Sequence, residues 1–277
     1  MIAMSLRLAA AAMAGLLLAA PAIAADAPAK AAASDERPDP RGPATSDAPL
    51  GALAPQNLNK KRPKPAFNLT GTWFVDLAHG GFLFGNPYPK LKPAAQAELD
   101  ASKKAAKEGK AYKDTIGQCY PAGLPVIMTR VWPIAMVQMP TVIYMVSGFE
   151  NAFRAIYMDG RPHSDPDVVV RSWNGESIGR WEGDTLVVDS KYFISDKHTI
   201  DAIPVSDDLH IVERIKLSKD GKQLSIRYIM TDPQNWDGEW ISDKNWKRTD
   251  DQDITEVECT PDLDQHLVST QSVLNIR

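Results

Sequence analysis

The sequence predicts a mostly β protein: a single antiparallel barrel of about 10–11 strands, with one surface helix over residues 93–108. From residue 69 onward, short segments rich in Val, Ile, Tyr, Trp and Thr alternate with clusters of Gly, Pro, Asn and Asp, which is typical of strands joined by turns. An antiparallel meander of this length exposes unpaired edges unless it closes or pairs them. A closed barrel is therefore the most economical arrangement.

The N-terminal region is expected to lie outside the barrel. An apolar run over residues 8–20 is too short to cross a bilayer and ends in a small-residue cleavage site. It predicts a signal peptide over residues 1–24, cut after Ala24, and hence a periplasmic or secreted protein. Residues 25–65, rich in Ala and Pro, predict a flexible tether, because they cannot bury enough apolar surface to offset the entropy of ordering. Residues 66–277 then form one β-barrel domain.

The strands and the helix follow in chain order. Pro93 suits a first helical position, helix formers continue to Lys107, and Gly109 offers a stop. Leu99 is the only large apolar residue of this helix, which should therefore lie on the surface. The expected strands cover residues 69–77, 126–131, 135–139, 142–147, 153–158, 177–181, 185–191, 209–217, 223–231, 239–248 and 254–259.

Three turns are expected to join consecutive strands as hairpins: Asp159-Gly160, Glu182-Gly183-Asp184 and Lys219-Asp220-Gly221-Lys222. Asp159-Gly160 is the strongest signal, because a type I′ turn needs positive φ at both central positions and Asp and Gly accept it most readily.

The two cysteines, Cys119 and Cys259, stand near opposite ends of the expected domain. In an oxidising compartment such a pair most simply forms a disulfide. Two free thiols are the first alternative. A metal site is the second, and the absence of a neighbouring His argues against it.

The charge pattern argues against nucleic acid as a partner. The formal net charge is −4, and the only dense Lys/Arg run, residues 59–64, lies in the tether. No apolar run after the signal peptide is long enough for a transmembrane helix. The sequence does not indicate an oligomeric state.

The first strand carries a more specific motif. Gly71-Thr72-Trp73 resembles the Gly-x-Trp opening of lipocalin-like (calycin) barrels, in which the Trp closes one end and a basic residue from the last strands covers it. That resemblance implies a lipocalin-like fold, with Lys247 or Arg248 as the covering residue through cation–π contact.

Three further motifs resemble a family of uncharacterised secreted bacterial proteins. They are Cys119-Tyr-Pro121-Ala-Gly123-Leu-Pro125, Arg154-Ala-Ile-Tyr-Met-Asp-Gly-Arg161-Pro-His163, and Gly175-Glu-Ser177-Ile-Gly179-Arg-Trp181-Glu-Gly-Asp-Thr-Leu-Val-Val-Asp189. The resemblance covers about residues 67–260, and it brings no reaction with it.

Two shorter patterns have alternatives to a catalytic or metal role. Gly175-Glu-Ser177-Ile-Gly179 matches the serine-hydrolase pattern, but a nucleophile elbow requires a strand that turns into a helix, and here a hairpin follows. We therefore expect glycines that permit close strand packing. His163-Ser164-Asp165 with Asp159 matches no metal loop spacing, so neither a metal nor a tightly bound cofactor is expected.

The density of charge around residues 150–189 has two interpretations. The structural interpretation is cross-strand ion pairs on a solvated sheet face. The functional interpretation starts from alternation, which places Arg154 on one face with Ile156 and Met158, so that Arg154 faces a cavity or needs a buried carboxylate. The candidate catalytic residues are then His163 as general acid or base, Asp159 or Asp184 as its orienter, and Arg154 or Arg161 as the oxyanion anchor.

The ligand-binding residues are expected among the aromatic, thioether and acidic side chains that accompany these charges: Tyr144, Glu150, Tyr157, Met158, Trp173 and Trp181. The sequence thus predicts a secreted barrel enzyme that acts on a small, largely apolar or aromatic molecule by acid–base chemistry. The alternatives are a non-catalytic lipocalin-like binding protein and a cell-envelope interaction module.

Overall fold

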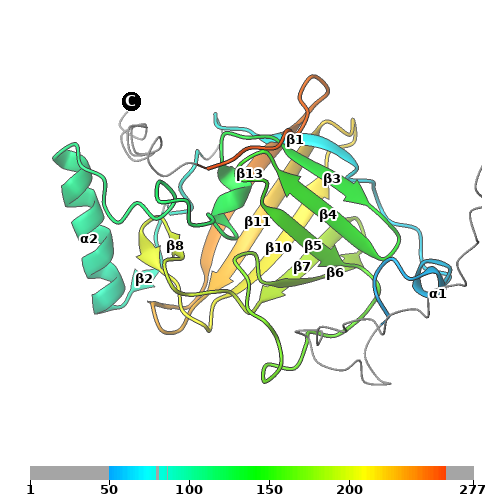
Figure 1. Cartoon of the computed structure of the whole chain (residues 1–277), viewed down its shortest axis with the longest axis horizontal. Coiled ribbons are helices and arrows are strands. Elements are labelled where there is room, and N and C mark those ends of the chain that lie inside the picture. The colour runs from blue at the N-terminus through cyan, green and yellow to red at the C-terminus, as the bar shows by residue number, and fades with distance from the viewer. Residues whose placement is uncertain (1–49, 79–80, 86, 260–277) are drawn as a thin grey trace, which may run out of the picture. The chain divides into compact units, whose positions relative to one another are not determined.

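The barrel closes with nine strands. The computed structural model describes residues 50–78, 81–85 and 87–259. The strands follow the order β1-β13-β11-β10-β7-β6-β5-β4-β3, and β1 closes the ring against β3 (Figure 1). They are β1 (Gly71–Val75), β3 (Ile134–Gln138), β4 (Val142–Ser147), β5 (Phe153–Tyr157), β6 (Glu176–Glu182), β7 (Thr185–Lys191), β10 (His210–Leu217), β11 (Gln223–Thr231) and β13 (Trp240–Thr249). The mostly β barrel is confirmed, with nine strands instead of 10–11.

Two of the expected strands are wrong. Residues 126–131 contain a 3₁₀ helix, η1 (Val126–Thr129), and Pro125 directly before it lacks the amide donor of a strand ladder. Residues 254–259 form no strand, because β1 and β11 already occupy both edges of β13. This last segment bonds to Asn151 instead, whose side chain contacts the backbone of Thr255 and Val257.

The expected Asp159-Gly160 hairpin is also wrong. β5 and β6 are neighbours but run parallel, so residues 158–175 form a crossover, as a parallel pair requires. Gly160 has a φ of 81°, but Asp159 is not in the positive-φ region that a type I′ turn needs. The other two turns join β6 to β7 and β10 to β11 as antiparallel hairpins, as expected.

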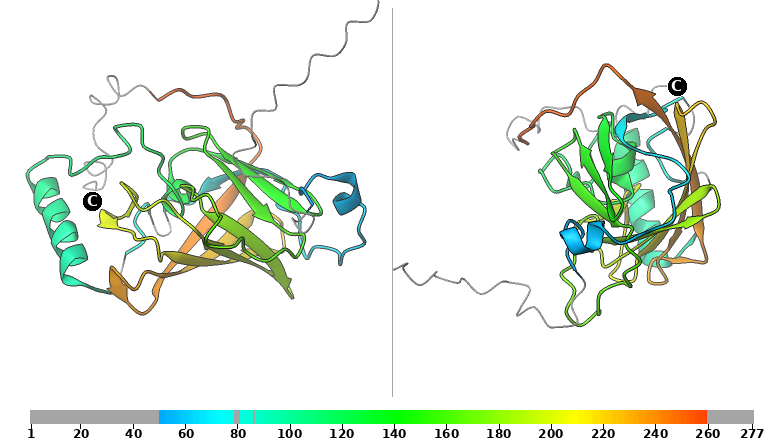
Figure 2. Two further views of the ribbon diagram at one scale, coloured as in Figure 1. Left: turned by 60° about the horizontal axis from the view of Figure 1, so that its bottom comes forward. Right: turned by 90° about the vertical axis from the view of Figure 1, so that its right-hand side faces the viewer.

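The surface helix is confirmed as α2 (Pro93–Lys107), which buries Leu99 and two small residues. It lies at one end of the barrel next to two small sheets, one of β2 (Lys90–Leu91) with β12 (Trp236–Asp237), the other of β8 (Thr199–Ile200) with β9 (Ile203–Pro204). A one-turn helix, α1 (Pro55–Leu58), lies at the opposite end (Figure 1 and the left view of Figure 2).

The described part of the expected tether, residues 50–65, contacts the barrel. Thr141 donates a hydrogen bond to the carbonyl of Ala52 at 2.6 Å, and the buried Asn57 amide donates to Asp159 at 2.8 Å. Contacts of the domain therefore begin before residue 66. The predicted signal peptide and residues 25–49 lie outside the described residues.

Trp73 occupies the position that the Gly-x-Trp motif predicts. Its ring is fully buried, and the guanidinium of Arg248 lies 5.3 Å from the ring centre. Arg248 also donates to the carbonyl of Thr70 at 2.6 Å, whereas Lys247 pairs with Asp76. A Cβ on Gly71 would lie 2.5 Å from the Arg248 guanidinium, so only glycine allows this approach. The arrangement fits a calycin-like fold.

The expected disulfide between Cys119 and Cys259 is formed. It connects the loop before η1 to the segment that follows β13. The two alternatives, free thiols and a metal site at these residues, are therefore excluded.

Candidate functional site

Arg154 points into the barrel, as strand alternation predicts, and there it meets a buried carboxylate. Its guanidinium donates to both carboxylate oxygens of Glu213 on β10, at 3.1 Å for the Nη1–Oε1 bond. The hydroxyls of Ser177 and Ser190 accept further bonds from Arg154, each at 3.1 Å. The side chains of Arg154 and Glu213 are only 4% and 0% exposed, so this is a desolvated ion pair.

Ser177 sits inside strand β6, so the Gly-x-Ser-x-Gly segment forms no nucleophile elbow. The packed side chains around this ion pair fill the barrel with large groups, including Trp73, Trp246 and Tyr228. Burial, followed by the nearby Glu213 carboxylate, raises the pKa of the Tyr228 phenol. The buried groups of the barrel thus include these large aromatic side chains and the Arg154–Glu213 ion pair.

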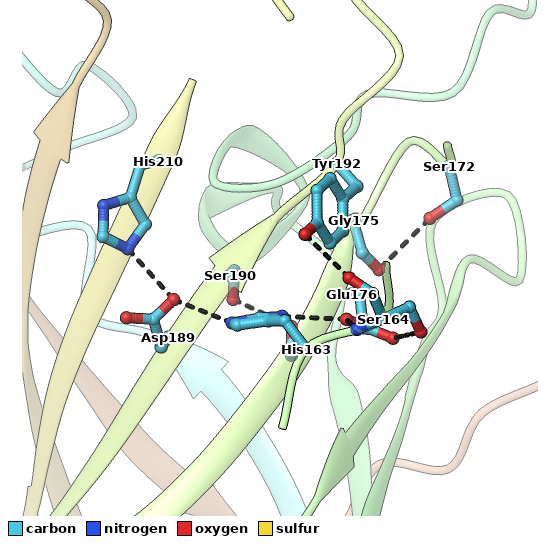
Figure 3. A network of polar contacts seen from close by, with 10 residues as sticks. His163, Ser164, Ser172, Gly175, Glu176, Asp189, Ser190, Tyr192 and His210 are labelled. Atoms are coloured by element: carbon cyan, nitrogen blue, oxygen red, sulfur yellow. Dashed lines mark hydrogen bonds and ion pairs between the residues drawn. The ribbon is translucent and has the colours of Figure 1, made fainter. Parts of the chain in front are cut away.

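His163 lies outside the barrel, in the crossover, and contacts two carboxylates (Figure 3). Its Nδ1 lies 2.8 Å from Glu176 on β6, and its Nε2 lies 2.9 Å from Asp189 on β7. His210 on β10 also bonds to Asp189, at 3.0 Å. Burial tends to raise the pKa of Asp189, but bonds from His210 and His163 outweigh it and hold the pKa at about 2.

This network ties the crossover to the outer face of the sheet. Glu176 also accepts bonds from the amide and the hydroxyl of Ser164, whose carbonyl accepts a bond from Tyr192 (Figure 3). Both ring nitrogens of His163 are thus engaged with carboxylate oxygens, so neither is free to contact a substrate. A general-base role for His163 would require one of these bonds to break.

The expected orienters of His163 lie elsewhere. Asp159 pairs with Arg161 at 2.6 Å; burial favours a higher pKa for its carboxyl, but Arg161 and Asn57 hold it at about 2. Asp184 is exposed in the β6–β7 hairpin and pairs with Lys216 at 3.1 Å. The carboxylates that contact His163 are Glu176 and Asp189, which alternation along β6 and β7 places together on the outer face.

The expected ligand-binding residues are dispersed around the barrel. Their main neighbours are Phe153 for Tyr144, Arg130 for Glu150, Arg161 for Tyr157, Gly179 for Met158, Tyr120 and His198 for Trp173, and Phe67 for Trp181. The structure therefore does not bring them together, and their ligand-binding role stays a prediction.

A pocket of about 670 Å³ lies between α2 and the adjacent end of the barrel. None of the expected site residues lines it. Its apolar walls include Phe82, Leu83, Leu99, Ile116, Val126 and Pro204. They come from five separate segments, residues 82–88, 98–106, 112–118, 126–130 and 195–204. Beside this wall, Phe84 packs on Tyr228, and its carbonyl accepts a hydrogen bond from Trp240.

Asp201 is the acidic group that holds the segment of residues 82–88 in this wall. One of its oxygens accepts bonds from the amides of Phe84 and Gly85, at 2.8 and 2.7 Å. The hydroxyl of Tyr88 also bonds to Asp201. Burial of the carboxylate raises the pKa of Asp201 to about 6, although the two amides and Lys244 counteract it. Burial, together with the Asp201 charge, raises the pKa of Tyr88.

The variant Asp201→Asn is expected to lose a pH dependence of stability that the parent protein shows. The folded-state pKa lies above the ordinary 3.8, so the stabilising effect of the protonated form is present below about pH 4 and is lost as pH rises through 6. Since one pKa unit corresponds to 1.36 kcal/mol, the free energy of unfolding should fall by about 3 kcal/mol over this range. Urea unfolding at pH 4 and pH 7 measures it.

Asn can still accept the two amide bonds, so the difference between Asp201→Asn and the parent isolates the titration. The same substitution at the exposed Asp250 is the control and should leave the pH profile unchanged. Parallel pH profiles for the parent and Asp201→Asn would contradict the prediction. Asp159 and Asp189 act in the opposite direction, because their low pKa values withdraw stability only as pH falls below about 4.

The pocket wall concentrates unusual backbone conformations. Eight non-glycine residues among those described have positive φ, and four of them line the pocket. These four are Lys113, Lys197, Asp201 and Ala202, with φ between 43° and 67°. Such conformations cost free energy and persist where the surrounding structure holds them, as at ligand sites.

The described residues contain neither a metal-binding cluster nor a membrane-spanning helix. No group of three His, Cys, Asp or Glu side chains there is arranged to hold a metal ion. In the same part of the chain, none of the helices has the length and apolar character needed to cross a membrane.

Comparisons with known proteins identify no family. No protein-family model and no curated protein matches the sequence. Among solved structures, apo lipid binding protein 8 (LBP-8) of Caenorhabditis elegans matches with 12% identity and a TM-score of 0.31, over 65% of this chain and 94% of that one. A similarity this distant carries no functional argument. The resemblance to secreted bacterial proteins stays a prediction.

Proposed function

We propose that this protein binds a small, largely apolar molecule in the pocket between α2 and the barrel. The observation that carries the proposal is a pocket of about 670 Å³, within the range of about 300–1,000 Å³ that is usual for ligand sites. Its walls combine apolar side chains with a few polar ones, which is the composition that gives such sites both affinity and orientation.

The residues of the barrel core and those of the pocket wall differ, and the difference supports a ligand site in the pocket. Buried tryptophans and the Arg154–Glu213 pair belong to the core of the barrel, and no residue of that pair lines the pocket. The pocket wall, in contrast, includes the loop of residues 112–118, which ends next to the disulfide at Cys119. A periplasmic or secreted location remains our proposal, and the disulfide supports it, because such bonds persist in oxidising compartments.

Filling the pocket is expected to weaken binding of a neutral apolar probe. Ala106 lines the pocket from α2, so Ala106→Trp should occupy the space and weaken binding of N-phenyl-1-naphthylamine at least about 10-fold. Probe fluorescence measures the affinity. Ala97→Trp on the exposed face of the same helix is the control and should bind as the parent does. Equal affinity of all three proteins would show that the probe does not use this pocket.

Acid–base catalysis in the same pocket is the second candidate. The observation that favours it is Asp201, whose pKa of about 6 is close to the working pH of a general acid or base and whose partner Tyr88 also lines the pocket. An enzyme of this kind would use Asp201 in place of the predicted His163. Turnover of a bound compound by the parent, lost in Asp201→Asn while probe binding persists, would distinguish an enzyme from a carrier.

A further inference from the structure

The ionisable groups of the pocket are unevenly paired. Glu98 is fully engaged, because it accepts bonds from Lys113 at 2.7 Å and from Tyr112 at 2.8 Å. Asp201 already accepts two backbone amides. The cations Lys103, Lys197 and Arg130 line the same pocket and form no ion pair with a carboxylate of the described residues. Asp114 also lines the pocket and has no ion pair among the described residues, so three such cations stand against one such carboxylate.

Arg130 is the enclosed member of these cations. Its Nε is buried and has no hydrogen-bond partner among the described residues. Its guanidinium lies 5.4 Å from the ring centre of Phe149. A buried guanidinium nitrogen without an acceptor is costly, so its retention calls for an acceptor that is not supplied by the described chain.

The charges around Arg130 do not replace that acceptor. Burial lowers the pKa of Arg130, and attraction by Glu150 and Asp114 only partly offsets it. This attraction is electrostatic, and the buried Nε of Arg130 receives no hydrogen-bond acceptor from the described residues. Lys103 lies over the ring of Tyr88 at 5.4 Å. Lys197 lies over the ring of Tyr120 at 4.0 Å and donates a hydrogen bond to its hydroxyl, and both lysine side chains are exposed.

We infer that the ligand of this pocket is an amphipathic anion, with an apolar body against the apolar walls and one anionic oxygen group, such as a carboxylate or sulfonate, bonded to Arg130. This inference rests on the proposed binding function and narrows its ligand class. Arg130 presents a planar fork of donors that matches such a group, while Lys103 and Lys197 add positive charge from exposed positions.

The test compares two probes that differ by one anionic group. 1-Anilinonaphthalene-8-sulfonate carries a sulfonate, and N-phenyl-1-naphthylamine has the same aromatic body without it. The parent should bind the sulfonate probe more tightly. Arg130→Met should weaken the sulfonate probe about 10- to 100-fold, as expected for loss of a charge-assisted bond, and change the neutral probe by less than about threefold. Arg130→Lys should retain part of the preference.

Controls separate this inference from the proposed function. Arg180→Met makes the same change on the exposed outer face and should leave both affinities unchanged. If Arg130→Met lowers the melting temperature, Arg130→Lys decides, and a complete loss of preference in that variant would count against a charge effect. Equal binding of both probes by the parent would overturn the anion inference and leave the pocket standing. If neither probe binds, or if Ala106→Trp affects neither, the proposed function itself fails.

Discussion

Replacing Glu213 by Ala is expected to lower the free energy of unfolding by about 3–5 kcal/mol. The substitution removes the carboxylate that receives both arms of the Arg154 guanidinium and leaves that charge inside the barrel. Ser177 and Ser190 remain as neutral acceptors and cannot compensate for the lost charge. Urea unfolding followed by tryptophan fluorescence measures the change.

Two companion variants test whether an unpaired buried charge is the cause. The double variant Arg154→Met, Glu213→Leu removes both charges and should recover most of the loss, because an apolar replacement of a buried pair is often neutral or stabilising. Asp243→Ala breaks the exposed pair with Arg227, at 2.8 Å, and should cost less than about 1 kcal/mol. A cost for Glu213→Ala no greater than that of Asp243→Ala would refute the proposed origin.

The same ion pair shows how far the sequence predicts the site. Strand alternation predicts that Arg154 shares a face with Ile156 and needs a cavity or a buried carboxylate, and the structure confirms the carboxylate. Glu213 was not identified from the sequence as this carboxylate. The pattern that indicates it is the alternation of Ile211, Glu213 and Ile215 along β10, which places the glutamate on the buried face. Pairing these residues also requires the order of the strands, and local pattern does not contain it.

The Asp159-Gly160 turn shows the limit of local signals. The dipeptide is a strong hairpin signature, yet the carboxylate of Asp159 is bound by Arg161 and by Asn57, which lies about a hundred residues earlier in the chain. Long-range contacts therefore override the local preference, and the chain continues into a crossover toward the parallel strand β6. The predicted hairpin at Gly183 is confirmed, because β6 and β7 pair as antiparallel neighbours on either side of this turn.

The pocket could not be predicted from the sequence for a related reason. Its lining comes from five segments that the sequence separates by up to about a hundred residues, and most of its members are ordinary helix or loop residues. Arg130 lies within the expected strand of residues 126–131, where a 3₁₀ helix over Val126–Thr129 forms instead. The charged residues around His163 predict a site there, but in the structure they form a hydrogen-bond network that holds the crossover. The pocket lies next to α2 instead.

Removing the disulfide, as Cys119→Ser with Cys259→Ser, is expected to lower the free energy of unfolding by about 2–5 kcal/mol. The bond joins residues 140 positions apart, so its loss gives the unfolded chain a large gain in entropy in the loop-closure account. The effect should also reach the ligand site, because residues 112–118 of the pocket wall end next to Cys119. We therefore expect weaker binding of N-phenyl-1-naphthylamine, by roughly threefold or more, under conditions where the variant remains folded.

The reduced parent provides the matched control for this variant. Adding dithiothreitol should shift the urea midpoint of the parent to that of the double serine variant and leave the variant itself unchanged. If the stability falls while probe affinity stays constant, the loop of residues 112–118 is held by its own contacts, such as that of Lys113 with Glu98, and the disulfide acts only on the unfolded chain. An unchanged midpoint in both proteins would contradict the prediction, because it would mean that the bond contributes nothing measurable to the fold.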